Sequence, residues 1–350
     1  MYPVMNLEEF NYELPSSLIA AFPMRERAAA RLLVLRRQSG EIVHSVFADL
    51  GDFLEPGDLL VLNDTRVFPA RLRGTKSSGG RVEVLLLERF SEAARTLWIA
   101  LVDGGKKPRV GSWFHFGEAV SAEVIGDLEG GRFALEFHHD GDFSVQLERL
   151  GEPPLPPYVR RQRDAQPLDR ERYQTVYAAQ SGAIAAPTAG FHFTPELFAK
   201  LSARGIQRSL LTLHVGPGTF QPVRESAIEK HRMEGERYVL AAESAGKINR
   251  AKQAGGRIVA VGTTSTRALE WIALKKGGLV ADEGVARLYI RPGDRFRVLD
   301  ALITNFHLPK STPLILVAAF AGLDLVHRAY REAIARKYRF YSYGDAMLIL

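Results

Sequence analysis

The sequence contains no cysteine among its 350 residues. This absence excludes disulfides, a thiolate nucleophile, cysteine-ligated zinc and iron–sulfur clusters, together with the radical chemistry that such clusters support. Long hydrophobic runs are also lacking, since the longest, Leu314 to Leu323, is far shorter than the roughly 20 residues of a membrane-spanning helix. The N-terminus shows no basic segment followed by an apolar one. We therefore expect a soluble, cytoplasmic protein that does not act at a membrane.

The composition is that of a globular protein with a large core. Hydrophobic residues make up 46% and charged residues 25% of a chain that is long enough for two domains. The formal net charge of +6 favours an acidic partner, and nucleic acid is the first candidate. Many basic proteins bind no nucleic acid, so the charge alone leaves the partner open.

The chain changes its pattern between residues 72 and 156. Short runs that alternate apolar and polar residues, such as 133–137, are separated there by clusters of Gly, Asp and Lys. This spacing, without a helical period, predicts a small inserted antiparallel barrel or sandwich. The flanking parts, 1–71 and 157–350, mix helix and strand signals and are predicted to form one discontinuous α/β body.

Several elements of this body can be placed from capping residues and apolar runs. We expect helices near Ser16 and over 195–205, 242–254 and 325–337, and strands over 31–35, 57–62, 257–262, 286–290, 296–299 and 346–350.

Three histidines, His192, His214 and His307, lie in similar segments: APTAGFHFT, TLHVGPGTF and TNFHLPKST. Such segments form rigid turns with few obstructing side chains, so a ring there can reach a ligand. A single histidine in an apolar setting is usually a packed core residue. Three of one pattern instead favour a common site. No histidine pair has the spacing of a metal site, and we assign no metal.

Two polar turns follow predicted strands. The first, Asn63–Arg66, contains Asp64, which is a candidate acid or base; Asp300, near the end of another strand, is a second candidate. Asn and Asp are also common in turns that bind no ligand, so the sequence leaves both interpretations open. Gly262–Thr266 leads from a strand into a helix, where free amides and hydroxyls can hold a carboxylate or phosphate. This turn has neither a P-loop nor a dinucleotide-binding motif, and threonine capping explains it nearly as well.

Small residues and a stiff linker complete the candidate segments. Gly216 and Gly218, like 186–190, permit close approach of a ligand or simply close packing. The proline-rich 153–157 leads to 158–163, where arginines lie beside a tyrosine. That segment predicts either phosphate and base contacts or a solvated linker.

Taken together, these segments closely resemble the S-adenosylmethionine:tRNA ribosyltransferase-isomerase family of queuosine biosynthesis. The resembling blocks follow one another in the order of the family: YELPSSLIAAFP, GDLLVLNDTRVFPARL, APTAGFHFT, LHVGPGTFQPV, VGTTSTRALE, DALITNFHLPKSTPLILVAAFAG and YRFYSYGDAMLI.

The resemblance implies an α/β body with an inserted β-barrel. It also implies transfer of the ribosyl part of S-adenosylmethionine to 7-aminomethyl-7-deazaguanine at the wobble position of a tRNA. The product would be epoxyqueuosine, with adenine and methionine released. S-adenosylmethionine would be a co-substrate, and no further cofactor is expected.

The resemblance also suggests roles for particular residues. The expected catalytic group comprises His192, His214, His307 and Asp64, because neutral histidine suits proton transfer near pH 7 and a carboxylate can orient a ring. The expected S-adenosylmethionine-binding residues are Thr188, Gly190, Gly216, Gly218, Thr219, Thr263, Thr264 and Ser265. The expected tRNA-binding residues are Arg66, Arg71, Arg160, Arg161 and Arg163.

Two other classes of protein remain as alternatives. A non-catalytic tRNA-binding module would need only the barrel, the basic charge and the arginine cluster. A methyltransferase would use the same co-substrate, but the acidic-x-Gly-x-Gly strand turn of those enzymes is not found in the sequence.

Overall fold

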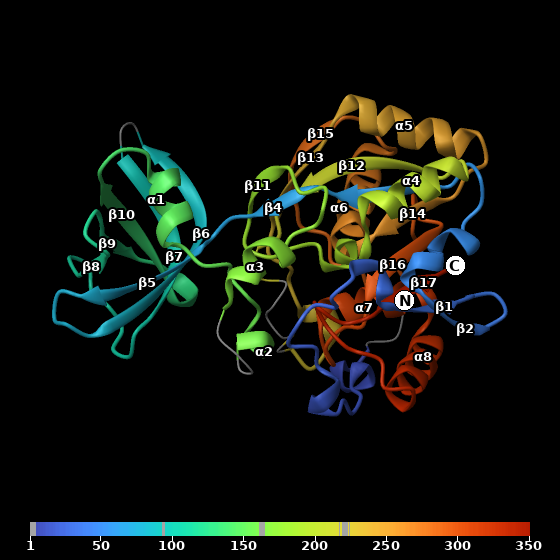
Figure 1. Cartoon of the computed structure of the whole chain (residues 1–350), viewed down its shortest axis with the longest axis horizontal. Coiled ribbons are helices and arrows are strands. Elements are labelled where there is room, and N and C mark those ends of the chain that lie inside the picture. Colours follow the sequence, from blue (N-terminus) through green and yellow to red (C-terminus); the bar gives the residue numbers. More distant parts are fainter. Residues whose placement is uncertain (1–4, 93–94, 161–164, 217, 219–222, 224) are drawn as a thin grey trace.

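The chain folds into an α/β body and a smaller β-barrel that is joined to it at one side (Figure 1). The computed structural model describes residues 5–92, 95–160, 165–216, 218, 223 and 225–350. This architecture confirms the predicted fold class.

A mixed sheet forms the centre of the body. Its spatial order is β15 (Asp282–Ala286), β13 (Glu236–Leu240), β12 (Gln207–Leu213), β3 (Leu59–Asn63), β14 (Ile258–Val261), β16 (Ala301–Asn305), β17 (Ala346–Ile349), β1 (Arg31–Leu35) and β2 (Ile42–Val46). The four strands β12, β3, β14 and β16 are mutually parallel. Their carboxyl ends therefore lie along one edge of the sheet.

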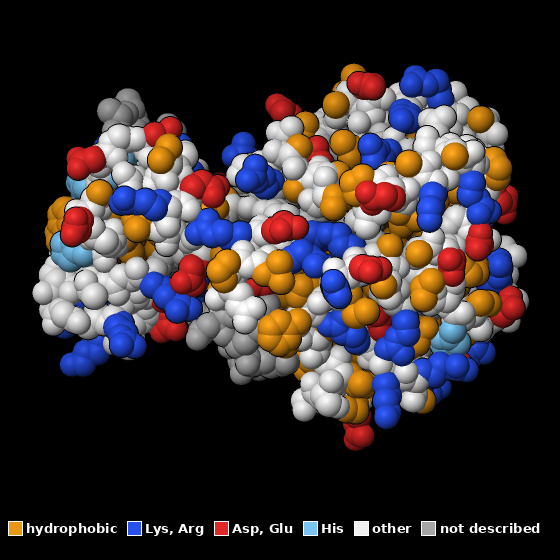
Figure 2. Space-filling model, viewed as in Figure 1, with side chains coloured by type: hydrophobic (Ala, Val, Ile, Leu, Met, Phe, Trp, Pro, Cys, Tyr) orange, Lys and Arg blue, Asp and Glu red, His pale blue; other side chains and the backbone are white. Residues whose placement is uncertain are grey.

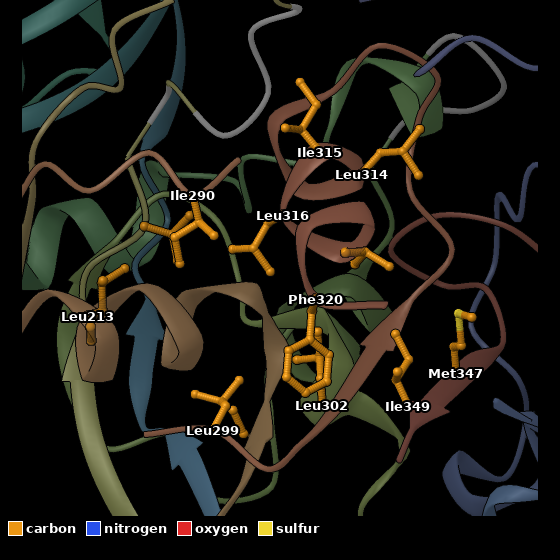
Figure 3. Close-up of a cluster of buried hydrophobic side chains, with 14 of the residues drawn as sticks. Leu213, Ile290, Leu299, Leu302, Leu314, Ile315, Leu316, Phe320, Met347 and Ile349 are labelled. Carbon is orange, nitrogen blue, oxygen red and sulfur yellow. The ribbon is translucent and has the colours of Figure 1, made fainter. Parts of the chain in front are cut away.

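The central strands β3 and β14 are buried on both faces, which explains why they consist almost wholly of apolar residues. In β3, Leu59 and Val61 belong to one hydrophobic cluster, whereas Leu60 and Leu62 belong to another. Helix α7 (Thr312–Ala321) packs on the first face, where Leu316 and Phe320 approach the sheet (Figure 3).

The other helices are mostly short and surround the sheet. They are α2 (Pro157–Arg160), α3 (Pro167–Arg172), α4 (Pro195–Ala203), α5 (Ala242–Gln253), α6 (Gly262–Lys276) and α8 (Leu323–Ala335). Turns of 3-10 helix are η1 (Leu7–Phe10), η2 (Ser16–Leu18), η3 (Arg27–Ala29), η4 (Phe47–Asp52), η5 (Glu129–Gly131), η6 (Thr188–His192) and η8 (Ile228–Lys230). The helices expected over 195–205, 242–254 and 325–337 are confirmed as α4, α5 and α8.

The barrel closes on itself through antiparallel pairs. Its order is β10 (Arg132–His139), β7 (Arg95–Asp103), β6 (Arg81–Glu92), β5 (Arg71–Lys76), β8 (Trp113–Phe116) and β9 (Val120–Asp127). Phe133, Leu135 and Phe137 all point into its core, as their alternation predicted. A helix, α1 (Phe143–Leu150), follows the last strand and was not predicted; Asp142 caps it by accepting the Ser144 N–H at 2.7 Å.

The chain crosses between the two parts at one place. Strand β4 (Thr65–Val67), which pairs with β11 (Gln180–Ala183), leads into the barrel. Where the chain enters and leaves the barrel, Arg71 and Glu152 exchange backbone hydrogen bonds of 3.2 and 2.8 Å. Lys and Arg side chains flank the narrowing between the two parts on the face shown in Figure 2.

Two predicted strands and one helix were wrong. Strand β15 ends at Ala286, and 296–299 form no strand, because the Glu270 carboxylate accepts the N–H groups of Arg297, Val298 and Leu299 at 2.7, 2.9 and 3.1 Å. Near Ser16 the chain makes one 3-10 turn without a side-chain cap, since its backbone pairs with Phe340 instead.

Within the described residues, no single helix is long and apolar enough to cross a membrane. Helices α7 and α8 together pass this test of length and composition, but they are bent by 114° at Gly322. Much of α7 is buried in the body, as expected for a core helix.

Candidate functional site

A pocket lies at the edge of the sheet where the parallel strands end. Its walls come from segments that are distant in the sequence: 185–189, 262–264, 304–308 and 341–342, with Tyr158, Val215, Ser311 and Pro313. Residues 262–264 directly follow the end of β14, and 304–308 cover the end of β16 and the loop behind it. Such an edge is where open α/β sheets bind their ligands.

Helix α6 begins at this pocket. Its N-cap residue, Val261, makes no side-chain cap, and Gly262 has φ +90°, a conformation that favours glycine. Thr263 and Thr264 line the pocket. Ser265 does not, because it is fully buried and its hydroxyl donates to the Val261 carbonyl at 2.8 Å. The uncapped amides of α6 are therefore available for an anionic group.

A chain of side chains leads from the pocket to His192. The Thr188 hydroxyl donates to Asn305 Oδ1 at 2.9 Å, and Asn305 Nδ2 lies 3.3 Å from His192 Nε2. His192 is buried against Phe47 and does not line the pocket. Burial, assisted by Arg27 and Arg339, lowers the pKa of His192 to about 3. The ring is therefore neutral and accepts the amide hydrogen bond.

Of the three predicted histidines, only His307 lines the pocket. Its Nε2 lies 2.6 Å from the Thr304 hydroxyl, its N–H donates to the Tyr330 hydroxyl at 3.0 Å, and its carbonyl accepts from the Tyr12 hydroxyl. Burial lowers the pKa of His307 to about 3. The residue is held at both backbone and ring, so its position in the pocket is well defined.

His214 and Asp64 lie beside the pocket, toward β4 and β11. His214 Nδ1 is 2.8 Å from the Thr65 hydroxyl, and burial followed by the charge of Arg237 lowers its pKa. Asp64 accepts a 2.6 Å hydrogen bond from the Thr212 hydroxyl, while burial raises its pKa. Asp300 lies at the opposite edge of the sheet, where it accepts the Ile258 N–H at 2.8 Å.

Asn63 connects these groups to the pocket and was not singled out by the sequence analysis. It is fully buried at the end of β3, and its Nδ2 donates to the Leu213 carbonyl at 2.8 Å and to the Thr264 hydroxyl at 3.3 Å. Its Oδ1 accepts the N–H groups of Thr65 and Leu213. The polar turn Asn63–Arg66 marked this region in the sequence, but the sequence analysis selected Asp64 from it.

The predicted glycines have packing roles in the described structure. A Cβ at Gly190 would lie 2.0 Å from the Tyr177 hydroxyl oxygen, so this position requires glycine. The N–H of Gly216 donates to Glu236 Oε1 at 3.1 Å, and Gly218 lies near Glu234. None of these three glycines lines the pocket. Thr219 lies outside the described residues.

The arginines predicted to bind tRNA lie in different environments. Arg66 is exposed on β4, beside the passage to the barrel. Arg71 is buried and paired with Glu83, which argues against contact with tRNA phosphates. The side chain of Arg160, and Arg161 and Arg163 entirely, lie outside the described part of the chain.

Tyr158 shows that the linker is not simply solvated. This residue, in α2, lines the pocket, and its hydroxyl shares a hydrogen bond with Ser342. Tyr158 and Tyr341 are in ring contact, with their centroids 4.7 Å apart. Together with Phe306 they make part of the pocket wall aromatic. Like Asn305, these aromatic residues were not among the predicted site residues.

The fold and the pocket define an α/β protein whose open sheet edge has room for a small ligand between the N-terminus of α6 and an aromatic wall. The family model described as "Queuosine biosynthesis protein" matches residues 7–349 of the chain. The chain belongs to this family.

Relatives of known name match over the full length. An S-adenosylmethionine:tRNA ribosyltransferase-isomerase of Pelobacter propionicus is 54% identical over 99% of this chain and 100% of its own length. A protein of the same name from Symbiobacterium thermophilum is 51% identical with the same coverage. The crystal structure of S-adenosylmethionine tRNA ribosyltransferase from Thermotoga maritima is 39% identical, covers 98% of this chain and 100% of its own, and has a TM-score of 0.55.

Proposed function

We propose that this chain transfers and isomerises the ribosyl part of S-adenosylmethionine onto 7-aminomethyl-7-deazaguanine at the wobble position of a tRNA. The products are epoxyqueuosine-tRNA, adenine and methionine. The observation that carries the proposal is that segments by which the chain resembles the family, APTAG, VGTTST, TNFHLPKS and YSYG, contribute to one pocket. S-adenosylmethionine acts as a co-substrate, without a further cofactor, in the cytoplasm.

The pocket offers complementary surfaces for the two ends of S-adenosylmethionine. The aromatic wall of Tyr158, Phe306 and Tyr341 suits the adenosine part, because flat rings pack well against aromatic side chains. The uncapped end of α6 suits the methionine carboxylate. In this orientation the sulfonium and the sugar lie between the two, within the pocket that His307 lines.

The reaction begins at the 5′ carbon, whose hydrogens are acidic because the sulfonium stabilises the adjacent negative charge. His307 accepts the 5′ proton, and the electron pair of the resulting ylide forms a C4′–C5′ double bond as the C4′–O4′ bond breaks. The ring oxygen becomes the carbonyl oxygen of C1′, and the C1′–N bond breaks to release adenine, which takes up a proton. The tRNA amine then adds to C4′, losing a proton, and this addition regenerates the ylide at C5′. The C5′ carbanion adds to the C1′ carbonyl to close the five-membered carbon ring, and the resulting alkoxide displaces the sulfur from C5′, which forms the epoxide and releases methionine. Burial lowers the pKa of His307 to about 3, so its ring is neutral at pH 7, which is the form that can accept a proton.

The other predicted residues support this arrangement. His192 acts through Asn305 and Thr188 and is a positioning residue. His214 and Asp64 lie on the side of β4, near exposed Arg66, where the tRNA nucleotide approaches. Cationic side chains beside the narrowing in Figure 2 contact tRNA phosphates.

The test is an incubation with S-adenosylmethionine and a tRNA carrying the aminomethyl-deazaguanine, followed by mass spectrometry. Equal amounts of adenine, methionine and epoxyqueuosine-tRNA are expected, and a tRNA with guanine at the wobble position serves as control. Release of adenosylhomocysteine would instead identify a methyltransferase. Binding of tRNA without any turnover, by folded protein, would identify a binding module.

A further inference from the structure

A second, smaller cavity lies next to the pocket on the other side of the α6 N-terminus. The two share Thr263, Thr264 and Pro313 in their walls. The smaller cavity is also lined by Arg267, one helical turn after Thr263, and by Tyr289. A ligand that occupies the main pocket can therefore extend past the first turn of α6 toward a guanidinium group.

Arg267 is fixed in this cavity but is not fully satisfied. Only 6% of the residue is exposed. Its Nη1 pairs with Glu236, and its Nε donates to the Leu288 carbonyl at 3.0 Å. Its Nη2 is buried and, among the residues that the structure describes, has no hydrogen-bond partner. Buried guanidinium N–H groups normally have partners, so an unpaired one in a cavity wall indicates a place for an acceptor.

The charges around Arg267 favour a singly charged acceptor. Glu236 neutralises the guanidinium, and the uncapped N-terminus of α6 adds a partial positive charge in the same place. A carboxylate can accept from Nη2 with one oxygen and from the helix amides with the other. The cavity is small, and this size fits the end of an extended ligand better than a ring.

We propose that Arg267 Nη2, with the first turn of α6, binds the carboxylate of the methionine part of S-adenosylmethionine. The assignment rests on the proposed function, because that function supplies the ligand. In this arrangement, Arg267 determines specificity, because it selects a sulfonium ligand that carries an amino-acid carboxylate.

Glu236 is the matching positioning residue. Its Oε2 holds Arg267 and its Oε1 accepts the Gly216 N–H at 3.1 Å. The carboxylate thus joins β13, α6 and the loop after His214. The orientation of Arg267 is consequently fixed before the ligand binds, which reduces the entropic cost of binding.

The first experiment needs no variant. Binding of S-adenosylmethionine and of decarboxylated S-adenosylmethionine, which keeps the sulfonium and the amine, is measured by calorimetry on the full chain. Hydrogen bonds to charged groups predict a preference for the carboxylate of about 10-fold to 100-fold. Equal affinities for the two ligands would overturn the proposal. If the folded chain binds neither ligand, the proposed function fails, and this inference fails with it.

Substitution then locates the contact. Arg267→Lys keeps a cation beside Glu236 but lacks the second N–H group, so the preference should fall below about 3-fold. Arg257→Lys is the matched control, since Arg257 pairs with buried Asp58 at 2.6 Å at the opposite edge of the sheet. The control should keep the full preference. A folded Arg267→Lys protein that also keeps it would show that the carboxylate binds elsewhere.

Discussion

The carboxyl edge of the sheet and the barrel bury their polar groups to different degrees. At the edge, Asn63, Asn305 and His192 are buried beside a pocket. Asn63 donates a hydrogen bond to Thr264, and Asn305 is hydrogen-bonded to His192. In the barrel, the pairs Arg95–Glu136 and Lys107–Asp127 lie nearer the surface, around a separate apolar core, and the more buried pair Arg71–Glu83 lies beside the junction with the body. Exposed pairs add little stability, whereas buried polar networks fix geometry.

The body and the barrel therefore contribute differently to the pocket. Within the described residues, the pocket lining contains no residue of the barrel strands. The body therefore holds the pocket in which we propose that the chemistry takes place, while the barrel adds surface beside the junction. Matched substitutions in the body and in the barrel test this division.

The largest effect is expected from His307→Gln, which preserves an acceptor for Thr304 but removes the ring. Loss of general acid–base catalysis should slow adenine release by about 10²-fold to 10⁴-fold. The rate is measured in single turnovers at saturating tRNA. His138→Gln in the barrel, which alters an exposed ring tilted against Trp113, should remain within about 2-fold of the parent. Equal losses in both variants would contradict the division.

The next largest effect concerns stability. Phe114 is fully buried in the barrel core, and Phe114→Ala should lower the free energy of unfolding by about 3–5 kcal/mol. Urea denaturation followed by tryptophan fluorescence measures this loss. Because the pocket is built from the body, affinity for S-adenosylmethionine should be unchanged in protein that is still folded. A parallel loss of affinity would show that the barrel supports the pocket.

The pH dependence of stability provides a third comparison. The folded-state pKa of His192 is lowered from 6.5 to about 3, so below pH 6.5 the unfolded chain binds the proton and the folded chain does not. Stability is therefore complete above pH 6.5 and falls toward pH 3, by about 1.4 kcal/mol per pH unit for this group.

The measurement is the free energy of unfolding at pH 6.5, 6.0 and 5.5. His192→Gln should reduce the slope in this range, because glutamine accepts from Asn305 without titrating. A slope that is the same in parent and variant would show that His192 does not remain neutral in the fold.

The smallest effect is expected from the loss of a single hydroxyl group. Thr188→Val removes the 2.9 Å hydrogen bond to Asn305, which should cost about 1 kcal/mol of positioning and slow adenine release by about 5-fold. Thr96→Val removes a bond of equal length to His139 in the barrel and should leave the rate unchanged. A slower reaction in the barrel variant alone would reverse the division.

Much of the fold could be predicted from local patterns. The alternation at 133–137 predicted the barrel core, and Gly255-Gly256 after 242–254 predicted the end of α5. The errors have a non-local cause. Residues 296–299 have strand-like composition, but a carboxylate from α6, Glu270, accepts their N–H groups. No pattern within the segment reveals such a partner.

The sequence predicted several of the segments that line the pocket, but less well which residues of those segments face it. Small, rigid turns after strands marked His307 and Thr263, which line the pocket, and also His192 and His214, which do not. Which ring reaches the pocket depends on the direction of each side chain. Asn63 was overlooked because its role arises from bonds to β12 and α6, which the topology brings together.

The paired backbone of Arg71 and Glu152 has a consequence for protein engineering. Because the chain enters and leaves the barrel through residues that hydrogen-bond to each other, the two ends of the insertion are already adjacent. A short turn joining Ala70 to Pro153 would span the gap without stretching the body. The barrel is in this sense an exchangeable unit, and barrels from relatives could be transplanted at this point while the sheet of the body is kept intact.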